Sequence, residues 1–227
     1  MGYGTAQGIG ALRRERLRTA RLYFVCEALP NGEEPEPLLR AALDGGVDII
    51  QLRDKSESKE VIERSAQTFR RLADTYSVPF LLNDDPDLAI QCGADGVHVG
   101  QDDVPVAEAR TVVGDDLLIG LSTHSEQQIR DAEGADYISV GPIWPTPTKE
   151  GRPAVGLELV QFAARTVPGP FFAIGGIDTE NVSEVLAVGA RRLCVVRAIR
   201  DSKDPAATAA SLRRAFAAVG DEVAPGA

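Results

Sequence analysis

The chain has 227 residues, 44% of them hydrophobic, which is enough to bury one substantial core, and a single domain is the better expectation. A net charge of -10, from 24 Lys and Arg against 34 Asp and Glu, disfavours nucleic acid and anionic membranes as partners. No apolar run approaches the roughly 20 residues of a membrane span, the N-terminal stretch is Gly-rich and polar, and the 3 cysteines form no CxxC pair, so we expect a cytoplasmic protein with reduced thiols.

The two ends of the chain lie outside its repeating pattern. We expect residues 1–18 to be a flexible N-terminal extension, within which residues 13–18 could form a short surface helix. The tail, residues 220–227, is also expected to be loose. Residues 19–219 should then form one domain.

Short apolar segments bounded by turn signals predict eight β-strands, at residues 21–26, 47–53, 79–83, 96–100, 117–122, 137–141, 171–174 and 193–196. Helical patterns lie between them, most clearly at 59–76 and 179–188. A glycine turn precedes several strands, as Gly-Val-Asp at 46–48, Gly-Ala-Asp at 93–95 and 134–136, and Gly-Ala-Arg at 189–191. Glycine in such a turn ends the preceding helix in the left-handed conformation.

The alternation of helices with nearly continuous apolar strands predicts a parallel sheet covered by helices. Eight such units in about 200 residues are typical of an α/β fold of one kind, a single (β/α)8 TIM barrel. The alternative is an open doubly wound sheet, which usually carries a GxGxxG motif after its first strand. Residues 26–29, Cys-Glu-Ala-Leu, do not resemble that motif.

The second predicted strand ends in a cluster of donors. Gln51, Arg53 and Lys55 alternate along the chain with Leu52 and Asp54, so their side chains point to one side of the strand. A buried strand has no structural need for an amide, a guanidinium and an ammonium within five residues. Their convergence indicates an anionic ligand, most plausibly a pyrophosphate.

Carboxylates follow the next two strands, in Asn-Asp-Asp-Pro at 83–86 and Gly-Gln-Asp-Asp at 100–103. Either motif alone fits a helix cap as well as a binding site. At neighbouring strand ends, however, paired carboxylates are ligands that Mg²⁺ uses when it also binds phosphates. We expect Asp84 and Asp103 to form the metal pair, while one aspartate of each motif could be only a cap.

The loop after the sixth strand and the ends of the last two strands suggest a second anion site. The loop is stiffened by prolines and carries Thr146, Thr148 and Lys149, whose side chains can donate hydrogen bonds to a phosphate. Gly175 and Gly176 follow the seventh strand, where barrels commonly bind phosphate. Two anion sites predict two phosphorylated small-molecule substrates. Of the two histidines, His98 is expected to be a hydrogen-bonded barrel residue, and His124 is a weaker candidate for chemistry.

Taken together, these motifs resemble the thiamine-phosphate synthase family. The segments 51–55, 83–85, 100–103, 146–149 and 175–177 occur in the family's order and spacing, and the similarity spans about residues 22–205. The resemblance implies a barrel enzyme of thiamine biosynthesis, a transferase that uses Mg²⁺. Its reaction would join hydroxymethylpyrimidine diphosphate to a thiazole phosphate, or to the carboxylated form of that thiazole, giving thiamine phosphate and pyrophosphate.

The resemblance also implies a role for each matching residue. Arg53, Ser122 and Lys149 would be catalytic, and Asp84 and Asp103 would hold Mg²⁺. The pyrimidine diphosphate would be bound by Gln51, Leu52, Arg53, Asp54, Lys55, Asn83, Ser122 and Lys149. The thiazole phosphate would be bound by Thr146, Pro147, Thr148, Gly176, Val196 and Arg197. Arg197 stands where the family often has serine, and Arg152 has no assigned role.

Two other functions fit parts of the pattern. A thiazole tautomerase would need His124 as an acid or base, but would have no use for a metal pair. A catalytically silent barrel that binds phosphorylated metabolites would need no leaving-group site. The sequence leaves a homo-oligomer open.

Overall fold

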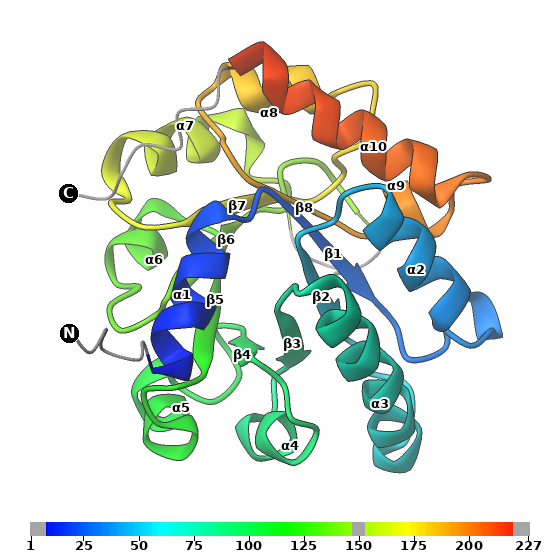
Figure 1. Ribbon diagram of the computed structural model, residues 1–227. Helices are drawn as coiled ribbons and strands as arrows, with labels where there is room; N and C mark the ends of the chain where they lie inside the picture. The colour runs from blue at the N-terminus through cyan, green and yellow to red at the C-terminus, as the bar shows by residue number, and fades with distance from the viewer. Residues whose placement is uncertain (1–7, 147–152, 220–227) are drawn as a thin grey trace, which may run out of the picture.

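The computed structural model describes residues 8–146 and 153–219, and it shows a closed barrel (Figure 1). Eight parallel strands pair in chain order, β1 to β8, and β8 pairs with β1. The strands are β1 Leu22–Cys26, β2 Ile49–Leu52, β3 Phe80–Asn83, β4 Gly96–Val99, β5 Leu118–Thr123, β6 Tyr137–Val140, β7 Phe171–Ile174 and β8 Leu193–Val195. The predicted TIM barrel is confirmed, and the open sheet is excluded because β1 and β8 are hydrogen-bonded.

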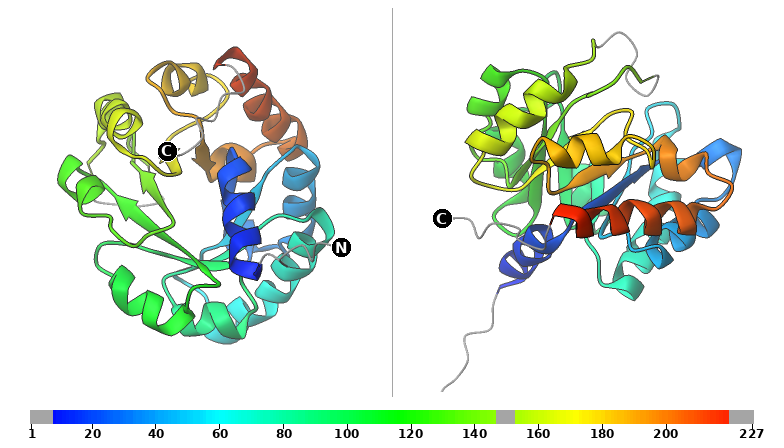
Figure 2. Two further views of the ribbon diagram at one scale, coloured as in Figure 1. Left: turned by 60° about the vertical axis from the view of Figure 1, so that its left-hand side comes forward. Right: turned by 90° about the horizontal axis from the view of Figure 1, so that it is seen from above.

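Helices surround the barrel on its outside (Figures 1 and 2). They are α1 Ile9–Thr19, α2 Glu36–Asp44, α3 Lys59–Tyr76, α4 Pro86–Gln91, α5 Val106–Val113, α6 Glu126–Arg130, α7 Gly156–Thr166, α8 Val182–Ala187, α9 Arg197–Arg200 and α10 Pro205–Ala215, with short 3₁₀ turns at Pro30–Gly32 and Phe216–Val219. Within the described part of the chain, no helix combines the length and the apolar character that a membrane crossing requires.

Two apolar clusters hold the barrel together. The larger one lies between the strands and the outer helices, where residues such as Phe69 of α3 and Phe80 of β3 are fully buried. The smaller one fills the barrel interior, where Tyr23, Tyr137 and Phe172 contact one another edge to face. Successive side chains of each strand point alternately outward, into the larger cluster, and inward, toward the barrel axis.

The aspartates of the glycine turns lie at the starts of the strands, where they accept hydrogen bonds from the backbone. Asp48 accepts from the N–H groups of Arg21 and Leu22 at 2.8 and 2.9 Å. Asp95 accepts from Phe80 N at 2.9 Å, and Asp136 from Ile119 N at 2.8 Å. An arginine from a neighbouring helix pairs with each carboxylate: Arg213 with Asp48, Arg70 with Asp95 and Arg110 with Asp136. Each aspartate, with its backbone donors and its arginine, therefore joins strands to a helix at the N-terminal mouth of the barrel, and we call this arrangement a clamp.

Within the predicted N-terminal extension, the helix allowed at residues 13–18 is present but longer, and the expected flexibility is wrong for residues 9–18. They belong to α1, which leads directly into β1 and lies across the barrel (Figure 2, left). Arg13 Nε and Arg14 Nε are each 2.8 Å from a carboxylate oxygen, of Asp95 and Asp136 respectively. Leu17 is buried against the interior cluster, so α1 closes the N-terminal mouth. Residues 1–7 and 220–227 lie outside the described part.

Candidate active site

The polar side chains of the candidate site lie at the C-terminal ends of the strands. Gln51 of β2 and Asn83 of β3 point inward, and Gln51 Nε2 donates to Asn83 Oδ1 at 3.2 Å. His98 of β4 is in register with Asn83, and its Nε2 lies 3.0 Å from Ser122 Oγ of β5. Period-two alternation places all four on the barrel axis, and Gln51, His98 and Ser122 are buried. Four neighbouring strands therefore contribute one polar side chain each to the C-terminal end of the barrel interior.

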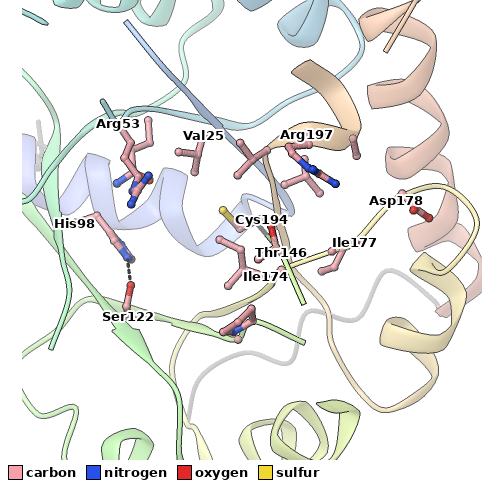
Figure 3. A pocket seen from close by; sticks show the side chains of 18 of the residues that line it. Val25, Arg53, His98, Ser122, Thr146, Ile174, Ile177, Asp178, Cys194 and Arg197 are labelled. Atoms are coloured by element: carbon pink, nitrogen blue, oxygen red, sulfur yellow. Dashed lines mark hydrogen bonds between the residues drawn. The ribbon is translucent and has the colours of Figure 1, made fainter. Parts of the chain in front are cut away.

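Above this layer lies a cavity of about 300 Å³ (Figure 3). Arg53, His98 and Ser122 line one side of it, and Thr146, Ile174 and Arg197 line the other (Figure 3). Of the predicted ligands, the cavity brings together Gln51, Arg53, Asn83, Ser122, Thr146, Gly176, Val196 and Arg197. These residues come from the ends of strands at both sides of the barrel, so one cavity can contact two substrates.

A second cavity of about 230 Å³ adjoins the first and is more acidic. It is lined by Lys55, Asp84, Asp102 and Asp103, together with Gly100 and Gln101. Five residues line both cavities and form a shared wall: Arg53, Asn83, His98, Ser122 and His124. A molecule in the first cavity therefore lies directly beside the carboxylates of the second.

Asp84 and Asp103, the expected metal pair, both line this second cavity, and their side chains are hydrogen-bonded to each other. Burial raises the pKa of Asp84, and a hydrogen bond with Asp103 raises it further, while Lys55 Nζ at 2.8 Å from Asp84 Oδ2 works in the opposite direction. The net shift is upward. Asp84 is held in the left-handed region with φ 66°, and Asp103 Oδ2 accepts from Gly100 N at 2.8 Å. The raised pKa of Asp84, next to a second half-buried carboxylate, indicates a site that favours a cation.

The neighbouring Asp85 has a different role. Its side chain accepts from Leu88 N at 2.9 Å and caps α4, whose first residue is Pro86. The cap and the candidate ligand are thus adjacent residues, and the structure distinguishes them. Among the described residues, no group of three or more His, Cys, Asp or Glu side chains is arranged to hold a metal by itself. Mg²⁺ itself usually keeps several water ligands and is bound through one or two carboxylates together with substrate phosphates.

Two predicted ligands have side chains that line neither cavity. Leu52 points outward into the cluster beneath the helices. Asp54 accepts from the backbone N–H groups of Ala28, Ser56 and Glu57 at 3.1, 3.0 and 3.2 Å. Burial alone would raise the pKa of Asp54, but these hydrogen bonds and one from the Ser56 hydroxyl lower it. Asp54 therefore shapes the loop that carries Arg53 and Lys55.

The other end of the first cavity is formed by glycines and by the start of α9. Gly175 and Gly176 have φ of 102° and 73°, which L side chains rarely adopt. A Cβ on Gly176 would lie 2.8 Å from Trp144 Cβ. Asn181 Nδ2 donates to Gly176 O at 2.8 Å and fixes the turn. Pro147, Thr148, Lys149 and Arg152 lie outside the described residues, so their predicted roles stay predictions.

Both histidines lie at the site. The expectation that His98 is a hydrogen-bonded barrel residue is confirmed, because its two ring nitrogens contact Tyr137 and Ser122. Its place in both cavities was missed, although its inward position in β4 could have indicated it. His124 Nδ1 contacts Gly141 O, and its backbone N–H donates to Gln128 Oε1 at 2.7 Å. Sequence reasoning also missed Val25, Asp178, Cys194 and Asp201 in the first cavity.

Comparison with known proteins gives one consistent family. A family model described as thiamine monophosphate synthase matches residues 22–199. The chain is 46% identical to a thiamine-phosphate synthase of Acidothermus cellulolyticus over 207 residues, covering 89% of this chain and 97% of the relative. It is 45% identical to the enzyme of that name from Thermobifida fusca, covering 90% of this chain and 96% of the relative.

Solved structures agree with the sequence comparison. The thiamine phosphate pyrophosphorylase of Pyrococcus furiosus superposes with a TM-score of 0.80 and 30% identity, covering 89% of this chain and 98% of that one. A 3-hexulose-6-phosphate synthase superposes with a TM-score of 0.61 at 18% identity, which shows the fold alone. The similarity to thiamine-phosphate synthases argues against the tautomerase and the silent barrel. This chain belongs to the thiamine monophosphate synthase family.

Proposed function

We propose that this protein is a Mg²⁺-dependent synthase that joins hydroxymethylpyrimidine diphosphate to a thiazole phosphate, giving thiamine phosphate and pyrophosphate. The observation that carries the proposal is the wall shared by the two cavities. The acidic cavity would take the diphosphate and its metal, and the larger cavity, of about 300 Å³, would take the two rings. The reacting methylene would lie at the wall, beside Ser122.

The reaction exchanges one bond for another. The C–O bond between the methylene and the diphosphate breaks, and its electron pair leaves with pyrophosphate. The lone pair of the thiazole nitrogen forms the new C–N bond, which leaves the nitrogen positively charged. With a thiazole phosphate as acceptor, the step needs no proton transfer, so the protein need not provide a strong base. It must stabilise the leaving group and hold the thiazole in line.

Asp84 and Asp103 would hold the metal, because the pKa of Asp84 stays raised despite Lys55, and Mg²⁺ typically binds one or two carboxylates plus substrate phosphates. When bound, Mg²⁺ neutralises the charge that develops on the departing pyrophosphate. Arg53 and Lys55 border the same cavity and would bind the diphosphate oxygens directly.

At the opposite end, the thiazole phosphate would bind over Gly176 and the backbone at Val196 and Arg197. A glycine at φ 73° exposes its backbone to a close ligand, and Arg197 adds a cation that also lies near Asp201. Gln51 and Asn83 offer amide groups to the pyrimidine ring. The five residues of the shared wall would exclude water from the methylene, which protects it from hydrolysis.

We also propose a cytoplasmic location. Cys26, Cys92 and Cys194 are unpaired with one another, and two of them are buried. Burial raises the pKa of the Cys92 thiol, so it stays protonated and unreactive. A reducing compartment suits such thiols.

The test is a synthase assay with purified diphosphate and thiazole phosphate, with and without Mg²⁺, on wild type, Asp84→Asn and Asp85→Asn. Asparagine tolerates the left-handed conformation of Asp84 and also caps helices well, so both variants should fold. We expect Mg²⁺-dependent product from wild type and Asp85→Asn, and about a hundredfold lower kcat/KM in Asp84→Asn. Folded wild-type protein that forms no product would refute the synthase proposal.

A further inference from the structure

A chain of buried hydrogen bonds runs through the barrel interior beneath Ser122. His98 Nε2 is 3.0 Å from Ser122 Oγ, His98 Nδ1 is 2.9 Å from Tyr137 Oη, and Tyr137 Oη is 3.1 Å from Tyr23 Oη. All four residues are buried, at 1–8% exposure. Polar groups in an apolar interior are costly unless each is hydrogen-bonded, and the proposed reaction uses neither tyrosine.

Strand β5 leaves space for this chain of bonds. Gly120 pairs with Tyr137 in the sheet register, and its φ gives it no conformational need to be glycine. A Cβ at Gly120 would lie 2.3 Å from Tyr137 Oη and 2.5 Å from His98 Nδ1. Any larger residue would displace the contact between the phenol and the imidazole. The absence of a side chain at Gly120 is thus a second observation, independent of the hydrogen bonds, that the fold accommodates the contact between Tyr137 and His98.

The direction of the bonds follows from counting protons. Burial raises the pKa of both phenols, so Tyr23 and Tyr137 each keep one proton to donate. Within the described residues, the Tyr23 hydroxyl is hydrogen-bonded only to Tyr137, so Tyr23 donates there. Tyr137 must then donate its own proton to His98 Nδ1. In the opposite order, the Tyr23 proton would be buried without an acceptor among those residues, which is unfavourable.

We propose that Tyr137 holds His98 as the tautomer protonated at Nε2, and that His98 thereby donates to Ser122 Oγ and directs the Ser122 hydroxyl proton toward the substrate cavity. Ser139 supports this arrangement, because its hydroxyl also donates to Ser122 Oγ, at 3.5 Å. Two donors on one oxygen leave Ser122 to act as a donor itself. Figure 3 shows the imidazole of His98 aimed at Ser122 on the wall of the cavity.

His98 and Tyr137 are therefore positioning residues, and Ser122 is the group that touches the substrate. This role rests on the proposed function, in which Ser122 donates to an acceptor atom, such as a ring nitrogen, of the bound pyrimidine. A hydroxyl that is oriented before the substrate binds needs no reorganisation during the reaction. The tautomer itself depends only on the fold.

The first experiment reads the tautomer directly by NMR, using histidine labelled with ¹⁵N in its ring and protein without a histidine tag. The chain has only 2 histidines, so a His124→Gln variant assigns both sets of signals. We expect His98 to be protonated at Nε2 in wild type and in Tyr23→Phe, and to lose this single tautomer in Tyr137→Phe. A wild-type His98 protonated at Nδ1 would overturn the proposal, whatever the variants do.

The second experiment measures kcat and KM in Tyr137→Phe and Tyr23→Phe. The two variants are matched, because each removes one buried hydroxyl and breaks the same bond between the tyrosines. In Tyr23→Phe, Tyr137 still donates to His98, so kcat should stay within about twofold of wild type. In Tyr137→Phe we expect about a fivefold loss of kcat with little change in KM, as one hydrogen bond is worth roughly 1 kcal/mol.

The outcomes separate this inference from the proposed function. Equal kcat in the two variants would show that the network is only structural. Wild-type protein with the expected tautomer but no synthase activity would refute the function and support the assignment of the tautomer. If Tyr137→Phe does not fold, the tautomer of His98 in the wild-type protein alone decides whether the proposal holds.

Discussion

Lys55 Nζ lies 2.8 Å from Asp84 Oδ2, so a cation of the proposed diphosphate site already pairs with a carboxylate of the proposed metal site. The ammonium only partly offsets the effects of burial and of Asp103, because the pKa of Asp84 remains raised. Lys55 is also half exposed and on a flexible side chain, so it can turn from Asp84 to a phosphate oxygen. In the proposed function, the pair would connect metal binding to diphosphate binding.

Replacing Lys55 should weaken binding of the diphosphate substrate alone. In Lys55→Met we expect the KM for the diphosphate to rise about tenfold or more, because a charged hydrogen bond is worth roughly 1.5–3 kcal/mol. The KM for thiazole phosphate should not change, since Lys55 does not line the larger cavity. Lys59→Met is the control, because Lys59 is equally exposed and has only a loose contact with Glu63, at 3.9 Å. Equal effects on both substrates would contradict the assignment.

The raised pKa of Asp84 predicts how activity depends on pH. Protons compete with the metal for this carboxylate, and they do so at a higher pH than at an ordinary aspartate. At limiting Mg²⁺, kcat/KM should therefore fall as the pH drops through the folded-state pKa of Asp84, and excess Mg²⁺ should move this fall to lower pH. Profiles recorded at two Mg²⁺ concentrations test this. Superimposable profiles would count against a metal on Asp84.

The same pKa has a consequence for stability. A carboxyl whose folded-state pKa is raised favours the folded state when it is protonated, and this contribution is lost as the pH rises through that pKa. Without metal at neutral pH, the charged Asp84 thus costs stability. The Asp84→Asn variant of the synthase assay should then have a Tm at least as high as wild type in the presence of a chelator.

The clamp at Asp95 should contribute stability in the opposite pH direction. Burial alone would raise the pKa of Asp95, but hydrogen bonds from Phe80 N, Arg70 and Arg13 lower it. Its contribution is therefore present above the ordinary carboxyl pKa and is lost as the pH falls through the lowered folded-state value. Asp95→Asn should reduce the free energy of unfolding at neutral pH by about 3 kcal/mol.

Urea unfolding at neutral and acidic pH checks this prediction. The matched control is Asp74→Asn, because Asp74 pairs with the same Arg70 at the same 2.8 Å but is 68% exposed. That variant should change stability by at most about 0.5 kcal/mol. The difference between the variants should shrink toward acidic pH, and a constant difference would contradict the proposed linkage.

Gly176→Ala should impair the thiazole phosphate end of the site. The residue has φ 73°, and the new methyl would lie 2.8 Å from Trp144 Cβ, so the turn must shift. We expect the KM for thiazole phosphate to rise about tenfold while the KM for the diphosphate stays within about twofold. Gly169→Ala is the control, since its Cβ would meet no atom within 4 Å. Steady-state kinetics with each substrate varied in turn measure the two KM values in both variants.

The sequence predicted the barrel because each strand carries its own signal. Apolar runs, the glycine turns and the inward alternation of Gln51 and Arg53 are all local, and they placed the C-terminal end of each strand to within one residue. The role of α1 could not be predicted in this way. Its bond from Arg13 to Asp95 joins residues 82 positions apart, and its few apolar residues give no strong helical stripe.

The candidate site was predictable in composition but not in detail. Asp84 and Asp85 have the same chemistry, and the following proline predicts a cap without saying which residue forms it. They are separated by the backbone conformation of Asp84, by its contact with Lys55, and by the hydrogen bond that Asp85 accepts from Leu88 N. Likewise, the pattern identified His98 as a barrel residue, but its contact with Tyr137 depends on space left by Gly120.

The helix α1 and the aspartate clamps lie at the mouth of the barrel opposite to both cavities. The residues that hold the barrel closed are therefore separate from those proposed to act on substrates. The loops around the cavities can change in evolution without loosening the fold, as long as the clamps persist. For protein engineering, the same separation favours attaching a fusion partner or a solid support ahead of α1, where it would leave the substrate entrance open.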